Sequence, residues 1–268
     1  MAAEEGALQL QYHYSWFFEI PGVAEGAPLA AIHGMGVPGA HDELANFHVV
    51  PASWFVFLII TAIAFMARSG LVKAQARGGT EQYVPDAGVG PRNLMELVVE
   101  GILNFMGTIL HSREQCVKHL PLVGTIFLYI LGSNLLGLVP GFLPPSSSMS
   151  NNLAMALVVF LVFNYEGIKE HGLIGYAKTL AGPIPLLAPA IFAVETFSLL
   201  IRPLTLSVRL YINMFADHLL LGVFSDLTLG LVVPAALIGL GTFVAFVQAF
   251  VFMLLTVVYI ALATSHDH

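Results

Sequence analysis

Residues 189–223 constrain this chain more than any other stretch, because they are as apolar as a membrane helix and yet contain several polar side chains. A helix of that length would extend about 50 Å at 1.5 Å per residue. The hydrocarbon core of a bilayer is only about 30 Å thick, so we expect the helix to tilt steeply or to bend, with Pro203 as the candidate for a bend. Its charged, titratable and amide side chains are Glu195, Arg202, Arg209, Asn213, Asp217 and His218.

Most of these polar residues share one face of the predicted helix. At 100° per residue, all of them except His218 fall within about 80° of arc, whereas His218 lies opposite Arg209. An arginine stays protonated at any accessible pH and costs about 2.5–3.5 kcal/mol in the middle of a membrane helix, so we expect it to have a function there. Polar groups on two faces predict two separate hydrated regions, with Arg209 between them.

The composition is that of an all-α polytopic membrane protein rather than a soluble domain. The chain has 268 residues, of which 57% are hydrophobic and only 10% are charged, and its mean hydropathy is +0.82. Its single cysteine, Cys116, excludes an internal disulfide. Residues 1–48 contain no Lys or Arg, which argues against a secretory signal peptide and favours an external N-terminal segment.

The apolar runs predict one membrane domain, residues 49–268, with five spanning helices and one amphipathic surface helix. The predicted spans are residues 49–67, 120–139, 152–165, 189–223 and 227–264, the last two being long and tilted, and the predicted surface helix is residues 91–113. Of the ten Lys and Arg residues, only Arg202 and Arg209 lie inside a span, and the others all fall in segments assigned to one side. The positive-inside rule therefore places the N-terminus outside and the C-terminus in the cytoplasm.

Several function classes are excluded by missing motifs. The chain has no GxxxxGK[ST] loop, no GxGxxG loop that follows a strand, and no HExxH pattern for zinc, so we expect no cofactor, no metal and no nucleic acid. A row of titratable and amide groups through a bilayer instead suits the passage of protons or ions. A fixed cation such as Arg209 would lower the pKa of a partner's carboxylic acid by about 1–3 units and would force it to release its proton.

Three segments resemble subunit a of F-type ATP synthases, the stator beside the rotating c-ring. They are ETFSLLIRPLTLSVRLYINMFADHLL at residues 195–220, SNLLGLVPG at 133–141 and QAFVFMLLTVVYIALA at 248–263. The resemblance covers residues 49–264. It implies a non-nucleotide-binding subunit of a bacterial-type plasma or inner membrane, in contact with lipid. It also implies three partners: a c-ring acidic residue facing Arg209, the subunit b stator stalk and other synthase subunits.

The resemblance assigns a role to each polar position. Arg209 matches the essential stator cation. The resemblance places six residues in the proton pathway: Glu195 and Ser198 on the cytoplasmic side, Asn213 and Gln248 beside the arginine, and Asp217 and His218 on the external side. Arg202 and Asn134 are expected to give structural or polar support.

Two positions depart from the family pattern. Gly241 stands where many members have His or Glu, so the external relay must use Asp217, His218 or water. Gly137 stands where some relatives have Asp.

Two other functions remain open from the residues alone. A solute/proton secondary transporter would need repeated halves around a central cavity, and a membrane scaffold would need no charge at Arg209. The sequence also leaves open whether the translocated ion is a proton or sodium, because selectivity would depend on the partner's carboxylate.

Overall fold

The computed structural model describes residues 49–77, 88, 90–139, 142, 144–181, 188–227 and 232–264. The predicted external segment, residues 1–48, lies outside the described residues. Within the described ranges the chain forms six α-helices and one short 3₁₀ helix and no strand, which confirms the all-α class. The elements are α4 (Val49–Arg77), α5 (Pro91–Leu110), α6 (Arg113–Gly137), η3 (Pro145–Ser147), α7 (Met149–Ala181), α8 (Ala188–Leu227) and α9 (Val232–Thr264).

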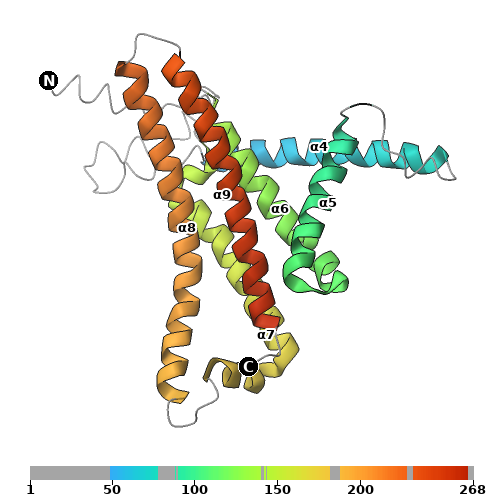
Figure 1. The fold of residues 1–268 in the computed structure, drawn as a ribbon, viewed down its shortest axis with the longest axis vertical. Helices are drawn as coiled ribbons and strands as arrows, with labels where there is room; N and C mark the ends of the chain where they lie inside the picture. The colour runs from blue at the N-terminus through green and yellow to red at the C-terminus, as the bar shows by residue number, and fades with distance from the viewer. Residues whose placement is uncertain are drawn as a thin grey trace, which may run out of the picture.

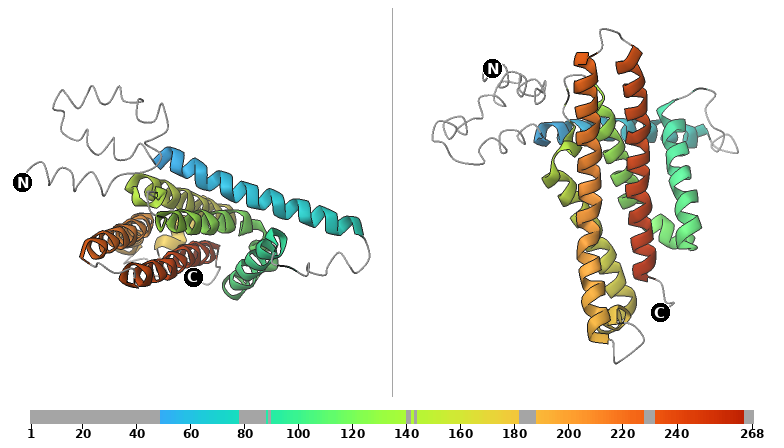
Figure 2. Two further views of the ribbon diagram at one scale, coloured as in Figure 1. Left: turned by 90° about the horizontal axis from the view of Figure 1, so that it is seen from above. Right: turned by 60° about the vertical axis from the view of Figure 1, so that its left-hand side comes forward.

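All six α-helices are long and apolar enough to cross a membrane, by length and composition. The sequence predicted five spans, and the sixth candidate is α5, whose place on the membrane surface stays a prediction. Figure 1 shows α4 lying across the long axes of α8 and α9, and the view from above in Figure 2 shows α4 lengthwise while α8 and α9 are seen nearly end-on. Because α4 lies across α8 and α9, these three helices cannot all be parallel to the membrane normal. If α4 crosses the bilayer, α8 and α9 must be steeply tilted.

The long helix α8 is continuous through Pro203. Its 40 residues correspond to about 60 Å of helix, twice the thickness of the hydrocarbon core. Tilt in the bilayer would accommodate the excess length of this helix.

The core of the molecule lies among α6, α7, α8 and α9. Its largest fully buried side chains include Ile130 of α6, Phe163 of α7, Leu210 of α8 and Phe252 of α9. Lipid tails are as apolar as these side chains, so close packing rather than transfer from water stabilises this bundle. The bundle fixes α8 beside α9, which sets the polar residues of the two helices against each other.

Helix α7 changes direction at Gly172, where φ is +71°. This left-handed backbone conformation suits glycine, which has no Cβ. The segment after the turn brings the Tyr176 ring against Gly167, where an added Cβ would lie 2.6 Å from Tyr176 Cε2. The predicted third span ended at residue 165, whereas the helical segment continues to Ala181.

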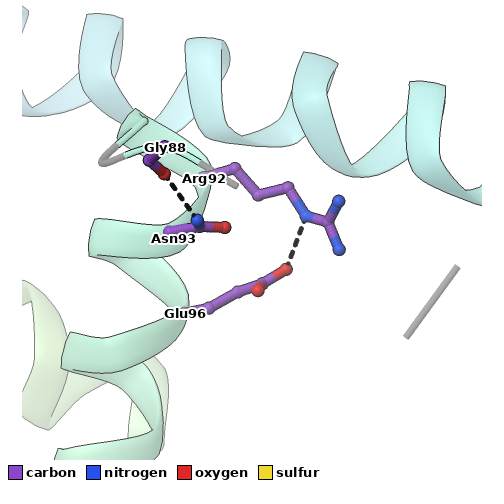
Figure 3. A network of polar contacts seen from close by, with 4 residues as sticks. All are labelled: Gly88, Arg92, Asn93 and Glu96. Carbon is purple, nitrogen blue, oxygen red and sulfur yellow. Dashed lines mark hydrogen bonds and ion pairs between the residues drawn. The ribbon is translucent and has the colours of Figure 1, made fainter. Parts of the chain in front are cut away.

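The start of α5 is held against α4 by a buried arginine, shown in Figure 3. Arg92 is only 6% exposed and lies against Gly70, where an added Cβ would be 3.2 Å from Arg92 Cβ. Its Nε donates to Glu96 Oε1 over 2.8 Å, and Asn93 Nδ2 donates to the Gly88 carbonyl over 2.8 Å. The contact between Arg92 and Gly70 packs the start of α5 against α4.

Candidate functional site

The polar residues in the C-terminal half of α8 meet α6 and α9 around a small cavity. Polar groups from all three helices reach it, although the helices are distant in sequence. The lining residues are Asn134 of α6, Leu138 at the C-cap of α6, Leu210, Asn213, Met214 and Asp217 of α8, and Gly241, Val244, Ala245 and Gln248 of α9. The structure thus brings together four of the residues predicted from the sequence, Asn134, Asn213, Asp217 and Gln248.

A hydrogen bond between two amides joins α8 to α9 at this cavity. Asn213 Nδ2 donates to Gln248 Oε1 over 2.6 Å. Gln248 is only 4% exposed, and its Nε2 is buried with no hydrogen-bond partner in the described part of the chain. A buried donor left in this state costs about 1–3 kcal/mol, which water in the cavity would offset.

Asn134 reaches the cavity from α6 and is 3% exposed. Its Oδ1 accepts a hydrogen bond of 2.8 Å from the hydroxyl of Ser146, which belongs to η3. Ser146 is itself held by Asn152, whose Nδ2 donates to the Ser146 carbonyl over 2.7 Å. The loop between α6 and α7 is therefore part of the wall behind Asn134.

The two glycines that depart from the family pattern both lie at close approaches. A Cβ added to Gly241 would lie 2.7 Å from Leu138 Cδ2, so α9 approaches α6 closely there. A Cβ added to Gly137 would lie 2.8 Å from Pro144 Cγ and would also collide with Met214. A longer side chain at either position would require its neighbours to move.

Arg209 lies one helical turn before Asn213 on α8, and its side chain is exposed. Among the described residues no ion pair involves it. Large apolar side chains are exposed near it in sequence, including Leu204 and Ile212. Arg209 is thus a cation on an otherwise apolar outer surface of the subunit.

The N-terminal half of α8 carries a second polar cluster. Arg202 Nη2 donates to Glu195 Oε1 over 2.9 Å, and the Arg202 guanidinium carbon lies 5.2 Å from the centre of the Tyr259 ring of α9. Ser198 is half-buried one turn after Glu195. The ion pair joins two turns of α8, and the structural support expected of Arg202 stays a prediction.

Tyr176 extends this cluster to α7. Its hydroxyl donates to Asn164 Oδ1 over 2.9 Å. Burial raises the pKa of Tyr176, while the nearby Arg202 guanidinium lowers it. The turn at Gly172 therefore places a phenol beside the Glu195–Arg202 pair.

Arg209 lies between the two polar regions along α8. It follows Arg202 by seven residues and precedes Asn213 by four, distances of about 10 Å and 6 Å along the helix axis. One region contains paired charges and the other contains amides, Asp217 and a cavity. A cation so placed separates two polar environments that do not share a side chain.

Comparison with known proteins identifies the family. The profile of the family described as "ATP synthase A chain" matches residues 50–261. The chain is 38% identical over 230 residues to "ATP synthase subunit a 1" of Pelobacter propionicus, covering 85% of this chain and 92% of that protein. The chain belongs to the ATP synthase subunit a family. Two further family members, from Nitratiruptor sp. and Campylobacter fetus, are each 40% identical over 82% and 85% of this chain and 95% and 96% of their own lengths.

Membership in the subunit a family confirms the resemblance carried by the three sequence motifs. It also agrees with six apolar helices of spanning length, and the chain is a multi-pass membrane protein. The side chain of His218, predicted for the external pathway, lies outside the described side chains. Its backbone continues α8.

Sequence reasoning missed three polar residues that the structure brings to the site. Ser146 contacts Asn134, and Tyr176 and Tyr259 lie at the Glu195–Arg202 pair. Ser146 lies in a Pro- and Ser-rich connection, which has no periodicity to reveal a buried side. Tyr259 lies in the QAFVFMLLTVVYIALA motif, but its position in the helical repeat does not distinguish it from the apolar residues around it.

Proposed function

We propose that this chain is the stator subunit a of a rotary F-type ATP synthase and that it provides two offset proton half-channels to the c-ring. Proton flow through the half-channels would be coupled to rotation of the ring. The observation that carries the proposal is the position of Arg209, an exposed cation on α8 between the cavity and the Glu195–Arg202 pair.

The chemistry follows from a permanent charge at the surface. A guanidinium keeps its proton at any accessible pH. A c-ring carboxylic acid that approaches it would have its pKa lowered by about 1–3 units and would release its proton to the exit path. The same cation repels a free proton, so a proton cannot pass directly between the half-channels without moving the ring. The exposed apolar side chains of α8 and α9 offer the surface for that ring.

By the positive-inside rule, the distribution of basic residues predicts that the C-terminal half of α8 faces the outside. The outer half-channel is then the cavity of Asn134, Asn213, Asp217 and Gln248, with His218 near its end. The inner half-channel starts at Glu195 and Ser198. The N-terminus would face outward and the C-terminus the cytoplasm of a bacterial-type plasma or inner membrane.

Asp217 supplies the external relay in place of a side chain at position 241. Gly241 has no side chain to relay a proton, and the absence of a Cβ leaves room for Leu138 beside α9. Asp217 lines the same cavity. A carboxylate there can accept a proton from cavity water and return it, which a glycine cannot.

The subunit would work with the c-ring, the subunit b stalk and other synthase subunits, surrounded by lipid, and would bind no nucleotide itself. Family membership does not favour the solute/proton transporter. An exposed arginine on α8 gives a scaffold no advantage, because the charge is costly in lipid.

The test is replacement of Arg209 by alanine in the assembled enzyme. Inverted membrane vesicles carrying Arg209→Ala should contain normal amounts of assembled complex but should lose ATP synthesis driven by an imposed proton gradient. The side chain is exposed, so its removal leaves no cavity in the subunit. Wild-type synthesis in these vesicles would refute the assignment.

A further inference from the structure

The two amides that bring α6 and α9 to the cavity have a common feature: the oxygen of each is already engaged. Gln248 Oε1 accepts from Asn213 Nδ2, and Asn134 Oδ1 accepts from the hydroxyl of Ser146. The NH₂ group of each amide is left to donate to water in the cavity. The Asp217 carboxylate on the same cavity wall is an acceptor.

Ser146 is fixed rigidly enough to orient Asn134. It is 0% exposed, and Asn152, also fully buried, holds its carbonyl over 2.7 Å. The 3₁₀ turn of η3 begins at Pro145, whose carbonyl accepts from Asn151 Nδ2 over 3.2 Å. Pro144 packs against Gly137 of α6. The hydroxyl of Ser146 therefore meets Asn134 from a fixed position.

The orientation of the amide matters to water in the cavity. A water molecule that accepts from the NH₂ group of Asn134 directs its own O–H bonds away from that amide. Those bonds are then available to Asp217 or to the next water. Without the hydroxyl of Ser146, the side chain of Asn134 would be free to change its rotamer, and the water in the cavity would lose a donor at a fixed position.

We propose that Ser146 is a positioning residue of the outer half-channel, which holds Asn134 with its NH₂ group toward the cavity and so orients the water that carries protons to Asp217. The role rests on the proposed function, since it presumes proton entry through this cavity. It adds the loop between α6 and α7 to the pathway, because η3 supplies the orienting hydroxyl.

A matched control lies at the next position of the same turn. The hydroxyl of Ser147 donates to the Pro144 carbonyl over 2.7 Å, a local contact three residues away that does not reach the cavity. Ser146→Ala and Ser147→Ala therefore each remove one hydroxyl from η3, and only the first releases Asn134.

The experiment measures proton conduction and ATP synthesis in membrane vesicles of the whole synthase, with passive conduction measured after removal of the catalytic sector. Ser146→Ala should lower both rates by about threefold to tenfold, the factor that loss of one buried hydrogen bond corresponds to, whereas Ser147→Ala should leave them unchanged. In an Asn134→Ala background, Ser146→Ala should cause no further loss, because the residue that it positions is gone.

Equal rates in Ser146→Ala and Ser147→Ala, or independent losses from Ser146→Ala and Asn134→Ala, would overturn the positioning role. If Ser146→Ala does not assemble, Ser146→Cys keeps the size and a weak donor. It should then lose part of the conduction, and wild-type conduction would count against the proposal. Arg209→Ala vesicles test the proposed function separately: coupled synthesis in them would refute that function whatever Ser146 does.

Discussion

The two polar regions along α8 differ in how their polar side chains are compensated. In the N-terminal half the polar groups are charges in pairs: Glu195 with Arg202 on α8, and nearby in the bundle Lys118 of α6 with Glu166 of α7. In the C-terminal half they are amides around a cavity, and among the described residues that line it Asp217 is the charged one. Paired charges partly compensate each other within the chain, whereas buried amides and a carboxyl in the cavity need water. The comparison therefore indicates a region fixed by the protein and a region completed by solvent.

Arg209 belongs to neither region. It has no ion pair within the described residues and is exposed on an apolar surface. A charge in that position is stable in a membrane only if a neighbouring molecule compensates it. Arg209 must therefore find its compensating contact outside the described part of this chain.

The largest effect within this comparison is expected from Arg209→Lys. An ammonium group can lose its proton when it is desolvated, whereas a guanidinium does not. The variant should therefore lose most ATP synthesis and should conduct protons passively without turnover. The measurement is the rate of ATP synthesis and the rate of passive proton conduction in the same vesicles. Wild-type coupling between the two would contradict the role of a permanent cation.

The next largest effect is expected from Gly241→Leu, which fills the solvent-completed region. A Cβ added there would lie 2.7 Å from Leu138 Cδ2, and Gly241 lines the cavity, so we expect a leucine to displace Leu138 and to fill cavity space. Overpacking of this kind costs about 1–3 kcal/mol, and we expect proton entry to fall by at least about tenfold. Passive proton conduction in stripped vesicles is the measurement.

The matched control for that variant is Gly239→Leu. An added Cβ at Gly239 meets nothing within 4 Å, so the same substitution two residues earlier should leave conduction unchanged. Equal loss in both variants would mean that added bulk on α9, rather than the cavity, limits conduction.

The smallest effect is expected in the region of paired charges. The side chains of Arg202 and Glu195 are 21% and 40% exposed, so solvent screens the pair and its coupling should be at most about 1 kcal/mol. Arg202→Gln should slow ATP synthesis by about twofold to fivefold. The double variant with Glu195→Gln should be no slower than Glu195→Gln alone. A double-mutant cycle on synthesis rates measures this, and additive losses would mean that the two residues act separately.

The amino-acid sequence by itself determined the helical class and the importance of Arg209. Long apolar runs must satisfy their backbone hydrogen bonds internally in lipid, which requires helices, and an arginine inside such a run is costly enough to demand a function. The motifs around it were also sufficient to indicate the family. These conclusions depend on local composition and on spacing within one helix.

Only the tertiary structure decided which polar residues lie on the exposed surface and which lie between helices. Periodicity placed Arg209 and Asn213 on one stripe, but Arg209 is exposed while Asn213 bonds to Gln248, because α9 covers one edge of that stripe and not the other. The contact of Ser146 with Asn134 likewise depends on how a loop folds onto a helix. Contacts between residues 12 to 35 positions apart follow from packing, which no helical period encodes.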